Sequence, residues 1–193
     1  CDETTNSVAE KEQYLRTIVN YYKPDILSCN EISKNVAVVD RLLDSVFNYN
    51  GNSDFARADI INESNSISLI TMLYYNKNKL GIASQHGVET DFRDFAFVKM
   101  YFKDQDLALT GDTAFFYCVS THLKAGDLSP DIAARKSMVD SLMKYMNSII
   151  TPGNFVLMGD LNFYTSNESG FQALVNHSNP NIRFLDPLNA MGD

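Results

Sequence analysis

The sequence has few of the features that assign a chain to a special class of protein. In its 193 residues no stretch approaches the run of about 18 apolar residues that a membrane-spanning helix requires. It contains no Cys-x-x-Cys pair or Cys/His cluster of the kind that holds zinc, and no internal repeat. With 45% hydrophobic and 21% charged residues, the composition is that of an ordinary globular protein, and we expect one domain over residues 1–193.

Positive charge is also scarce, because 24 acidic residues outnumber 16 basic ones and the net charge is -8. Broad binding of nucleic acid depends on Lys and Arg contacts to phosphate, so this balance argues against it. A nuclease that binds weakly, or whose bound cations offset its carboxylates, stays open. The charge does not bear on a small phosphorylated substrate.

Cysteine is limited to Cys1, Cys29 and Cys118. The last two lie in the apolar runs "ILSC" and "FFYCV", which predicts small buried thiols. Because the chain begins at Cys1 without a methionine or a signal peptide, we expect a processed or trimmed piece of a longer product. This expectation favours a secreted or cell-envelope protein, in which an N-terminal cysteine can carry lipid.

Hydrophobic patterning predicts apolar strands that alternate with helices. A capping box at Ser7 opens a first helix, which Pro24 ends, and the clearest helix begins with Ser129 as its cap and Pro130 at its first position. Residues 57–102 predict consecutive strands rich in β-branched and aromatic residues. The inner face of a further helix is predicted to comprise Val36, Val39, Leu43, Val46 and Phe47. This order indicates a mixed sheet in an α/β or α+β domain.

Three separated strands carry polar side chains at their C-terminal ends. "PDILSCNE" finishes on Glu31, "FFYCVSTH" on His122, and "FVLMGDLN" on Asp160 and Asn162. Ligand sites form where the carboxyl ends of strands meet, so we expect these side chains to converge. Asp160 and Asn162 are two positions apart, which predicts that both point to one face of an extended chain.

These residue types suit metal-assisted hydrolysis of a phosphate ester. A carboxylate such as Glu31 suits Mg²⁺, and His122 can donate to a phosphate oxygen or transfer a proton. Asp160 can activate a water, and Asn162 can fix its geometry. Each residue also has a structural interpretation: a solvated glutamate, a histidine satisfied at the edge of the core, and an ordinary turn. The residues alone leave both interpretations open.

The segments "PDILSCNEI", "STHLKAG" and "VLMGDLNFY" resemble, in this order, motifs of the endonuclease/exonuclease/phosphatase superfamily, which includes pancreatic-type deoxyribonucleases, inositol polyphosphate 5-phosphatases and bacterial sphingomyelinases. The resemblance spans residues 24–164. It implies a four-layer α/β sandwich of two mixed, mostly antiparallel sheets flanked by helices. It also implies Mg²⁺, or Mn²⁺ in its place, held by Glu31, with His122 on the scissile phosphate, Asp160 on the attacking water and Asn162 in support.

Three further residues are candidates for substrate contact. Asn30 stands beside the metal-binding position, where the family often has glutamine. Lys124 and Arg135 are cations that can touch phosphate, although Arg135 fits a residue of the helix surface or of an ion pair better.

The chain departs from the family pattern at both ends. The family's first strand, with a metal-binding asparagine, is missing before the first helix. Its closing Asp-His pair is missing too, because none of His86, His122 and His177 follows an Asp. A sheet without its outer strands exposes apolar edges, so we expect the native product to be longer at both ends.

Two functions of different classes follow. The first is a Mg²⁺-dependent phosphoesterase in which an activated water attacks in line, and its substrate is nucleic acid, a phospholipid headgroup or a small phosphorylated molecule. The strand-rich middle and "HLKAGDLSPDIAAR" resemble the nuclease-like bacterial branch of the family. The second is a non-catalytic interaction module that keeps the fold with an incomplete site. The four retained site residues favour the enzyme.

Overall fold

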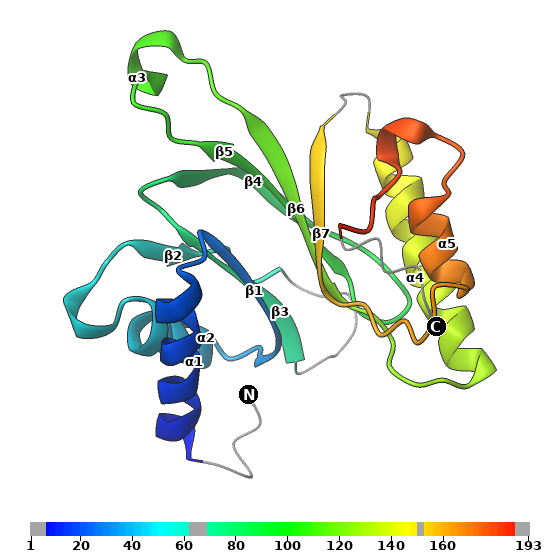
Figure 1. Cartoon of the computed structure of the whole chain (residues 1–193), viewed down its shortest axis with the longest axis horizontal. Helices are drawn as coiled ribbons and strands as arrows, with labels where there is room; N and C mark the ends of the chain where they lie inside the picture. Colours follow the sequence, from blue (N-terminus) through cyan, green and yellow to red (C-terminus); the bar gives the residue numbers. More distant parts are fainter. Residues whose placement is uncertain (1–6, 62–68, 150–152, 188–193) are drawn as a thin grey trace.

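The computed structural model of the chain describes residues 7–61, 69–149 and 153–187 (Figure 1). Its helices are α1 (Val8–Tyr22), α2 (Val36–Leu42), α3 (Leu107–Thr110), α4 (Ser129–Ser148) and α5 (Ser169–Val175), with shorter turns η1 (Leu43–Phe47), η2 (Tyr49–Gly51) and η3 (Pro180–Ile182). Its strands are β1 (Ile26–Ser33), β2 (Phe55–Arg57), β3 (Leu69–Asn76), β4 (Leu80–Val88), β5 (Phe95–Phe102), β6 (Phe115–His122) and β7 (Asn154–Asp160).

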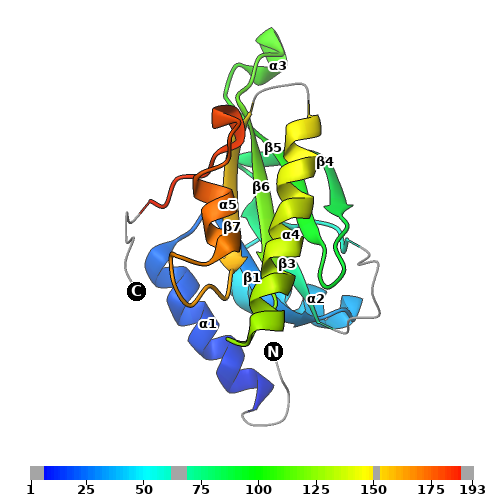
Figure 2. The same ribbon diagram turned by 90° about the vertical axis from the view of Figure 1, so that its right-hand side faces the viewer.

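These strands form two sheets, which the helices flank. The three-stranded sheet has the order β1-β3-β2 and is antiparallel. The four-stranded sheet has the order β4-β5-β6-β7 and is antiparallel except for the parallel pair β6 and β7. Helices α1 and α2 lie on the side of the first sheet, and α4 and α5 cover the outer face of the second (Figures 1 and 2). The predicted four-layer α/β sandwich is therefore confirmed.

The apolar core divides into three clusters that follow these layers. One cluster lies under α4 and α5, a second under α1 and α2, and a third joins residues of both sheets. The methionines of α4 at positions 138, 143 and 146 are all buried in the first cluster, so they fill the core. None of the helices in the described ranges has the length and apolar character needed to cross a membrane.

Two sequence predictions about helix ends are wrong in detail. Leu128, in an extended conformation, occupies the cap position of α4 without a side-chain hydrogen bond, so Ser129 and Pro130 both lie within the first turn. Val36 is 53% exposed, because it is the first residue of α2, next to the cap Asn35, whose Oδ1 accepts a hydrogen bond from the Ala37 amide. The capping box at Ser7 is present as predicted.

The two cysteines in the described residues are free thiols whose pKa values are raised by burial. Cys118 is buried, and burial raises its pKa to about 12. Cys29 is half-buried, and burial raises its pKa to about 11. Both side chains therefore stay protonated and poorly nucleophilic at neutral pH. Cys1 lies outside the described residues.

The end of β7 depends on a glycine. Gly159 pairs with Thr121 of β6 and has a φ of 129°. A Cβ atom built on Gly159 would lie only 1.9 Å from the backbone oxygen of Thr121. A larger residue would therefore push β7 away from β6 just before Asp160.

Replacing Gly159 tests this close approach. We expect Gly159→Ala to lower the free energy of unfolding by about 2 kcal/mol or more, because it adds a backbone clash to a strained φ. The matched control is Gly111→Ala, since Gly111 also has a positive φ but an added Cβ would meet no atom within 4 Å, and we expect a loss of roughly 1 kcal/mol there. Urea denaturation measures both, and equal losses would contradict the close approach of β6 and β7.

Candidate active site

The register of the parallel pair β6 and β7 brings two of the predicted site residues together. His122 and Asp160 are paired across these strands, at the carboxyl end of both. His122 Nε2 lies 3.7 Å from Asp160 Oδ2. The imidazole is 8% exposed and the carboxylate is 55% exposed, so a buried histidine lies beside an accessible acid.

Glu31 reaches the same edge through an irregularity in β1. The pairing of β1 with β3 shifts register between Cys29 and Ile32, and Glu31 takes a positive φ of 58° within this bulge. Bulges re-aim the side chains of a strand. β1 packs against β6 and β7 across the two sheets, and the exposed Glu31 carboxylate acts electrostatically on His122. The predicted convergence of the three strand ends is therefore present in the structure.

The electrostatics of His122 follow from these neighbours. Burial is the main cause that lowers its pKa below the ordinary value of 6.5, and the positive charge of Arg93 lowers it further. The carboxylates of Asp160 and Glu31 oppose this shift. His122 is therefore neutral at pH 7, with one ring nitrogen able to donate a hydrogen bond and the other able to accept one.

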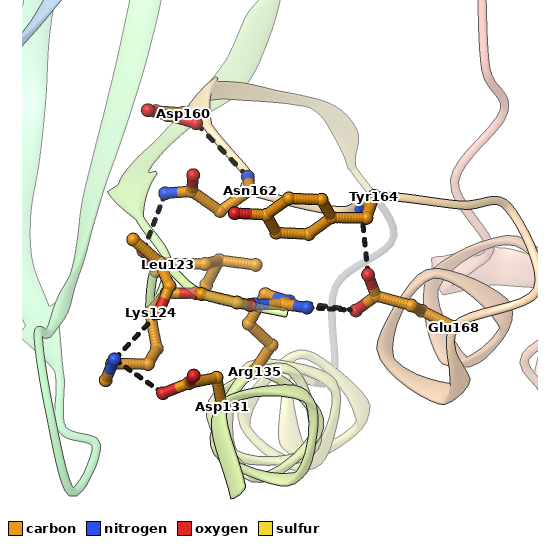
Figure 3. A network of polar contacts seen from close by, with 10 residues as sticks. Leu123, Lys124, Asp131, Arg135, Asp160, Asn162, Tyr164 and Glu168 are labelled. Carbon is orange, nitrogen blue, oxygen red and sulfur yellow. Dashed lines mark hydrogen bonds and ion pairs between the residues drawn. The ribbon is translucent and has the colours of Figure 1, made fainter. Parts of the chain in front are cut away.

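Asp160 and Asn162 form a turn as well as part of the site (Figure 3). β7 ends at Asp160, and Asn162 has a left-handed φ of 50°, so the prediction that both side chains share a face of an extended chain is wrong. The Asn162 amide instead donates to Asp160 Oδ1 at 3.1 Å, and Asn162 Nδ2 donates to the Leu123 oxygen at 3.0 Å. The amide side chain thus ties the end of β7 to the end of β6.

Two of the predicted substrate contacts lie beside the site. Asn30 is in the β1 bulge next to Glu31, and its Oδ1 accepts a hydrogen bond of 2.9 Å from Thr71 Oγ1. Lys124 follows β6, and its Nζ lies 2.6 Å from Asp131 Oδ1 of α4. Both side chains have protein partners, and their contact with a substrate stays a prediction.

Arg135 has a different position from the one predicted. Its side chain is completely buried, with Nη2 2.7 Å and Nε 2.9 Å from Glu168 Oε2. Of the two structural alternatives that the sequence left open for Arg135, a helix-surface residue or a member of an ion pair, the structure shows the ion pair. Direct contact between Arg135 and a substrate is contradicted, because the guanidinium is closed off from solvent.

Glu31 is the residue at this edge that the sequence predicts to bind a metal ion. The described ranges contain no group of three or more His, Cys, Asp or Glu side chains placed to hold a metal ion. Mg²⁺ commonly needs only one or two carboxylates, because water and substrate oxygens complete its shell. An exposed carboxylate at a strand bulge, beside Asp160 and His122, fits that kind of site and does not fit a dedicated protein cage.

Arg93 is a neighbour of the site that sequence reasoning missed. It lies in the connection between β4 and β5, and its Nη1 donates to the backbone oxygen of His122 at 3.4 Å. Its segment, "DFRDF", carries no motif and does not end a strand. Only the pairing of β5 with β6 brings this connection beside the end of β6.

The pKa of His122 provides a test of this geometry. We expect Asp160→Asn to lower it further, because the variant removes a negative charge that favours imidazolium, and Arg93→Gln to raise it, because the variant removes a positive charge. NMR titration of the imidazole C–H signals measures both shifts. His86 is the internal control, since burial alone lowers its pKa. An unchanged His122 pKa in both variants would contradict the arrangement.

Comparisons with known proteins agree with this fold. No protein-family model matches the sequence, and no curated protein matches it. Among solved structures, the human Nocturnin catalytic domain with bound sulfate is similar at a TM-score of 0.61 and 16% identity, with 88% of this chain and 62% of that chain covered. TDP2 of D. rerio, complexed with a single-strand DNA product, has a TM-score of 0.58 and 14% identity, with coverage of 84% and 58%.

A third similar structure belongs to a named family. It is an endonuclease/exonuclease/phosphatase family protein from Bacteroides thetaiotaomicron, with a TM-score of 0.60, 14% identity and coverage of 86% of this chain and 60% of that chain. The chain thus spans about three-fifths of the length of these structures, with 62%, 58% and 60% of each covered. The chain has the fold of the endonuclease/exonuclease/phosphatase superfamily.

Proposed function

We propose that this chain is the core of a Mg²⁺-dependent hydrolase of phosphate esters, in which a water attacks phosphorus in line with the leaving group. The observation that carries the proposal is the meeting of Glu31, His122 and Asp160 at one edge of two facing sheets. A metal-binding carboxylate, a neutral histidine and an exposed acid are the groups that this reaction needs.

Each side chain has a role that fits its environment. Asp160 is the exposed carboxylate, and it accepts the proton of the attacking water as the new P–O bond forms. The P–O bond to the leaving group breaks at the same time, and the leaving oxygen takes a proton from solvent to depart as an alcohol. His122 is neutral near pH 7 and donates a hydrogen bond to a phosphate oxygen, which stabilises the charge of the transition state. Mg²⁺, when bound by Glu31, would supply positive charge to the phosphate oxygens.

The charge of the chain narrows the substrate. A net charge of -8 disfavours a long duplex, whose binding depends on many Lys and Arg contacts. The similar TDP2 structure holds a single-strand DNA product, and another similar structure is described as a mannosyl-6-phosphatase from Bacteroides thetaiotaomicron. We therefore propose that the substrate is a single-stranded nucleic acid or a small phosphate ester.

One observation favours a second function, that of a non-catalytic interaction module. His86 and His177 do not complete the site around His122. His86 bonds with Tyr145 and stacks on Phe97 at the interface with α4, and His177 accepts a hydrogen bond from the Asn179 amide. This second function would be supported if the protein bound Mg²⁺ or a partner but hydrolysed no phosphate ester.

Hydrolysis by matched variants tests the proposal. With Mg²⁺ and bis-p-nitrophenyl phosphate, a single-stranded oligonucleotide and a sugar phosphate as substrates, we expect Asp160→Asn and His122→Gln each to lower kcat by roughly 10²- to 10⁴-fold. Asp112→Asn is the control, because this exposed carboxylate precedes β6 and lies at the opposite end of that strand from His122. An Asp160→Asn variant that hydrolyses every substrate at the wild-type rate would sink the mechanism.

Glu31 is tested separately through the metal. We expect Glu31→Gln to raise the Mg²⁺ concentration for half-maximal activity by at least about tenfold, because one carboxylate provides most of the protein's contribution to binding. A Mg²⁺ titration followed by NMR gives a second readout that needs no turnover. Asp112→Asn should titrate like the wild type, and an unchanged midpoint for Glu31→Gln would remove Glu31 from the metal site.

A further inference from the structure

A fully buried arginine lies directly behind the site. The Arg135 side chain has 0% exposure, although it is on α4 and the site residues are on strands. Burying a charge is costly unless it is paired and hydrogen-bonded. The hydrogen-bond and ion-pair partners of Arg135 therefore indicate its role. They contact or belong to the two segments that follow β6 and β7.

The first segment, residues 123–126, continues from His122 at the end of β6. Arg135 Nη1 donates to the backbone oxygens of Lys124 at 2.8 Å and Gly126 at 2.6 Å. The neighbouring Lys124–Asp131 ion pair joins the same segment to α4. Arg135 thus fixes the backbone that leaves β6, and a salt bridge at the surface reinforces it.

The second segment, residues 160–164, continues from the end of β7. Glu168 is the ion-pair partner of Arg135, and its other oxygen, Oε1, accepts a hydrogen bond from the Tyr164 amide at 2.7 Å. The ring of Tyr164 lies over the guanidinium, with its centroid 5.4 Å from Arg135 Cζ. One buried ion pair therefore contacts both segments (Figure 3).

The two segments are also joined to each other in front of this ion pair. Asn162 Nδ2 donates to the Leu123 oxygen at 3.0 Å, and the Leu123 amide donates to the Asp160 oxygen at 2.9 Å. These bonds fix the relation between the residue after His122 and the residue that is proposed to activate water. The ion pair behind them holds the backbone in the conformation in which they form.

We infer that Arg135 and Glu168 form a positioning clamp, which sets the distance between His122 and Asp160 for the reaction. The inference rests on the proposed function. Neither clamp residue touches the substrate, because Arg135 is closed off from solvent and Glu168 is buried. Buried ion pairs add little net stability compared with apolar residues of the same size, so the clamp acts chiefly through geometry.

The clamp is tested by removing both charges together. A single substitution strands an unpaired charge in the interior and can unfold the chain, whereas Arg135→Met with Glu168→Leu replaces the pair by apolar groups. We expect this double variant to unfold cooperatively but to lose roughly 10- to 100-fold in kcat, because a displacement of about 1 Å costs that much. KM should change little, since neither residue binds substrate.

A second ion pair in the chain provides the matched control. Glu12 and Arg41 join α1 to the end of α2, with a distance of 2.6 Å and Glu12 largely buried. We expect Glu12→Leu with Arg41→Met to leave kcat unchanged. Glu168→Gln, which keeps the shape of the side chain, should lose less activity than the double clamp variant and remains usable if that variant does not fold.

Amide hydrogen exchange separates the clamp from the proposed function. The clamp predicts at least tenfold faster exchange at Leu123 and Tyr164 in the variants, with no change at Val119 in the middle of β6. If the wild-type protein has no hydrolase activity, the proposed function is wrong. The exchange rates at Leu123 and Tyr164 then still test the clamp. The clamp would be overturned if the amides of Leu123 and Tyr164 exchanged at the wild-type rate in the variants. It would also be overturned if a folded double variant kept the wild-type kcat.

Discussion

The parallel pairing of β6 with β7 is the constraint on which the rest of the site depends. Its register places His122 opposite Asp160, and a slip of β7 by one residue would turn the Asp160 side chain to the other face of the sheet. Gly159 permits the two backbones to approach closely at this point. The apolar faces of both strands supply the free energy that holds the register, and the polar ends use the geometry that results.

The convergence of the site was predictable because two of its strands are apolar up to a polar C-terminal residue. His122 and Asp160 follow that rule. Glu31 does not, because β1 continues past a bulge to Ser33. The four-layer fold was implied by the resemblance of the three segments to the family. The turn at Asn162 was not predictable from spacing alone, since its left-handed φ depends on hydrogen bonds to Asp160 and to Leu123, which is 39 residues earlier. The local pattern of apolar and polar residues predicts a strand well, but it does not predict the conformation of the residues that follow the strand.

Arg135 shows the same limit for a helix. A charged residue in "IAARKSM" is typical of a solvent-facing position, yet this one is buried, because Glu168, 33 residues away, and two backbone oxygens of another segment surround it. The next residue, Lys136, does lie toward the surface and pairs with Asp140 one turn later. Which of two adjacent cations is enclosed is decided by tertiary contacts that neither propensity nor periodicity contains.

We propose that phosphate binds where Glu31, His122 and Asp160 meet. A crystal structure of the chain with Mg²⁺ and vanadate, which imitates the five-coordinate phosphorus of the transition state, is the decisive test. We expect vanadate in contact with His122 and Asp160, and a metal ion bound to Glu31. Vanadate and metal bound at a different surface, with this edge empty at saturating concentrations of both, would contradict it.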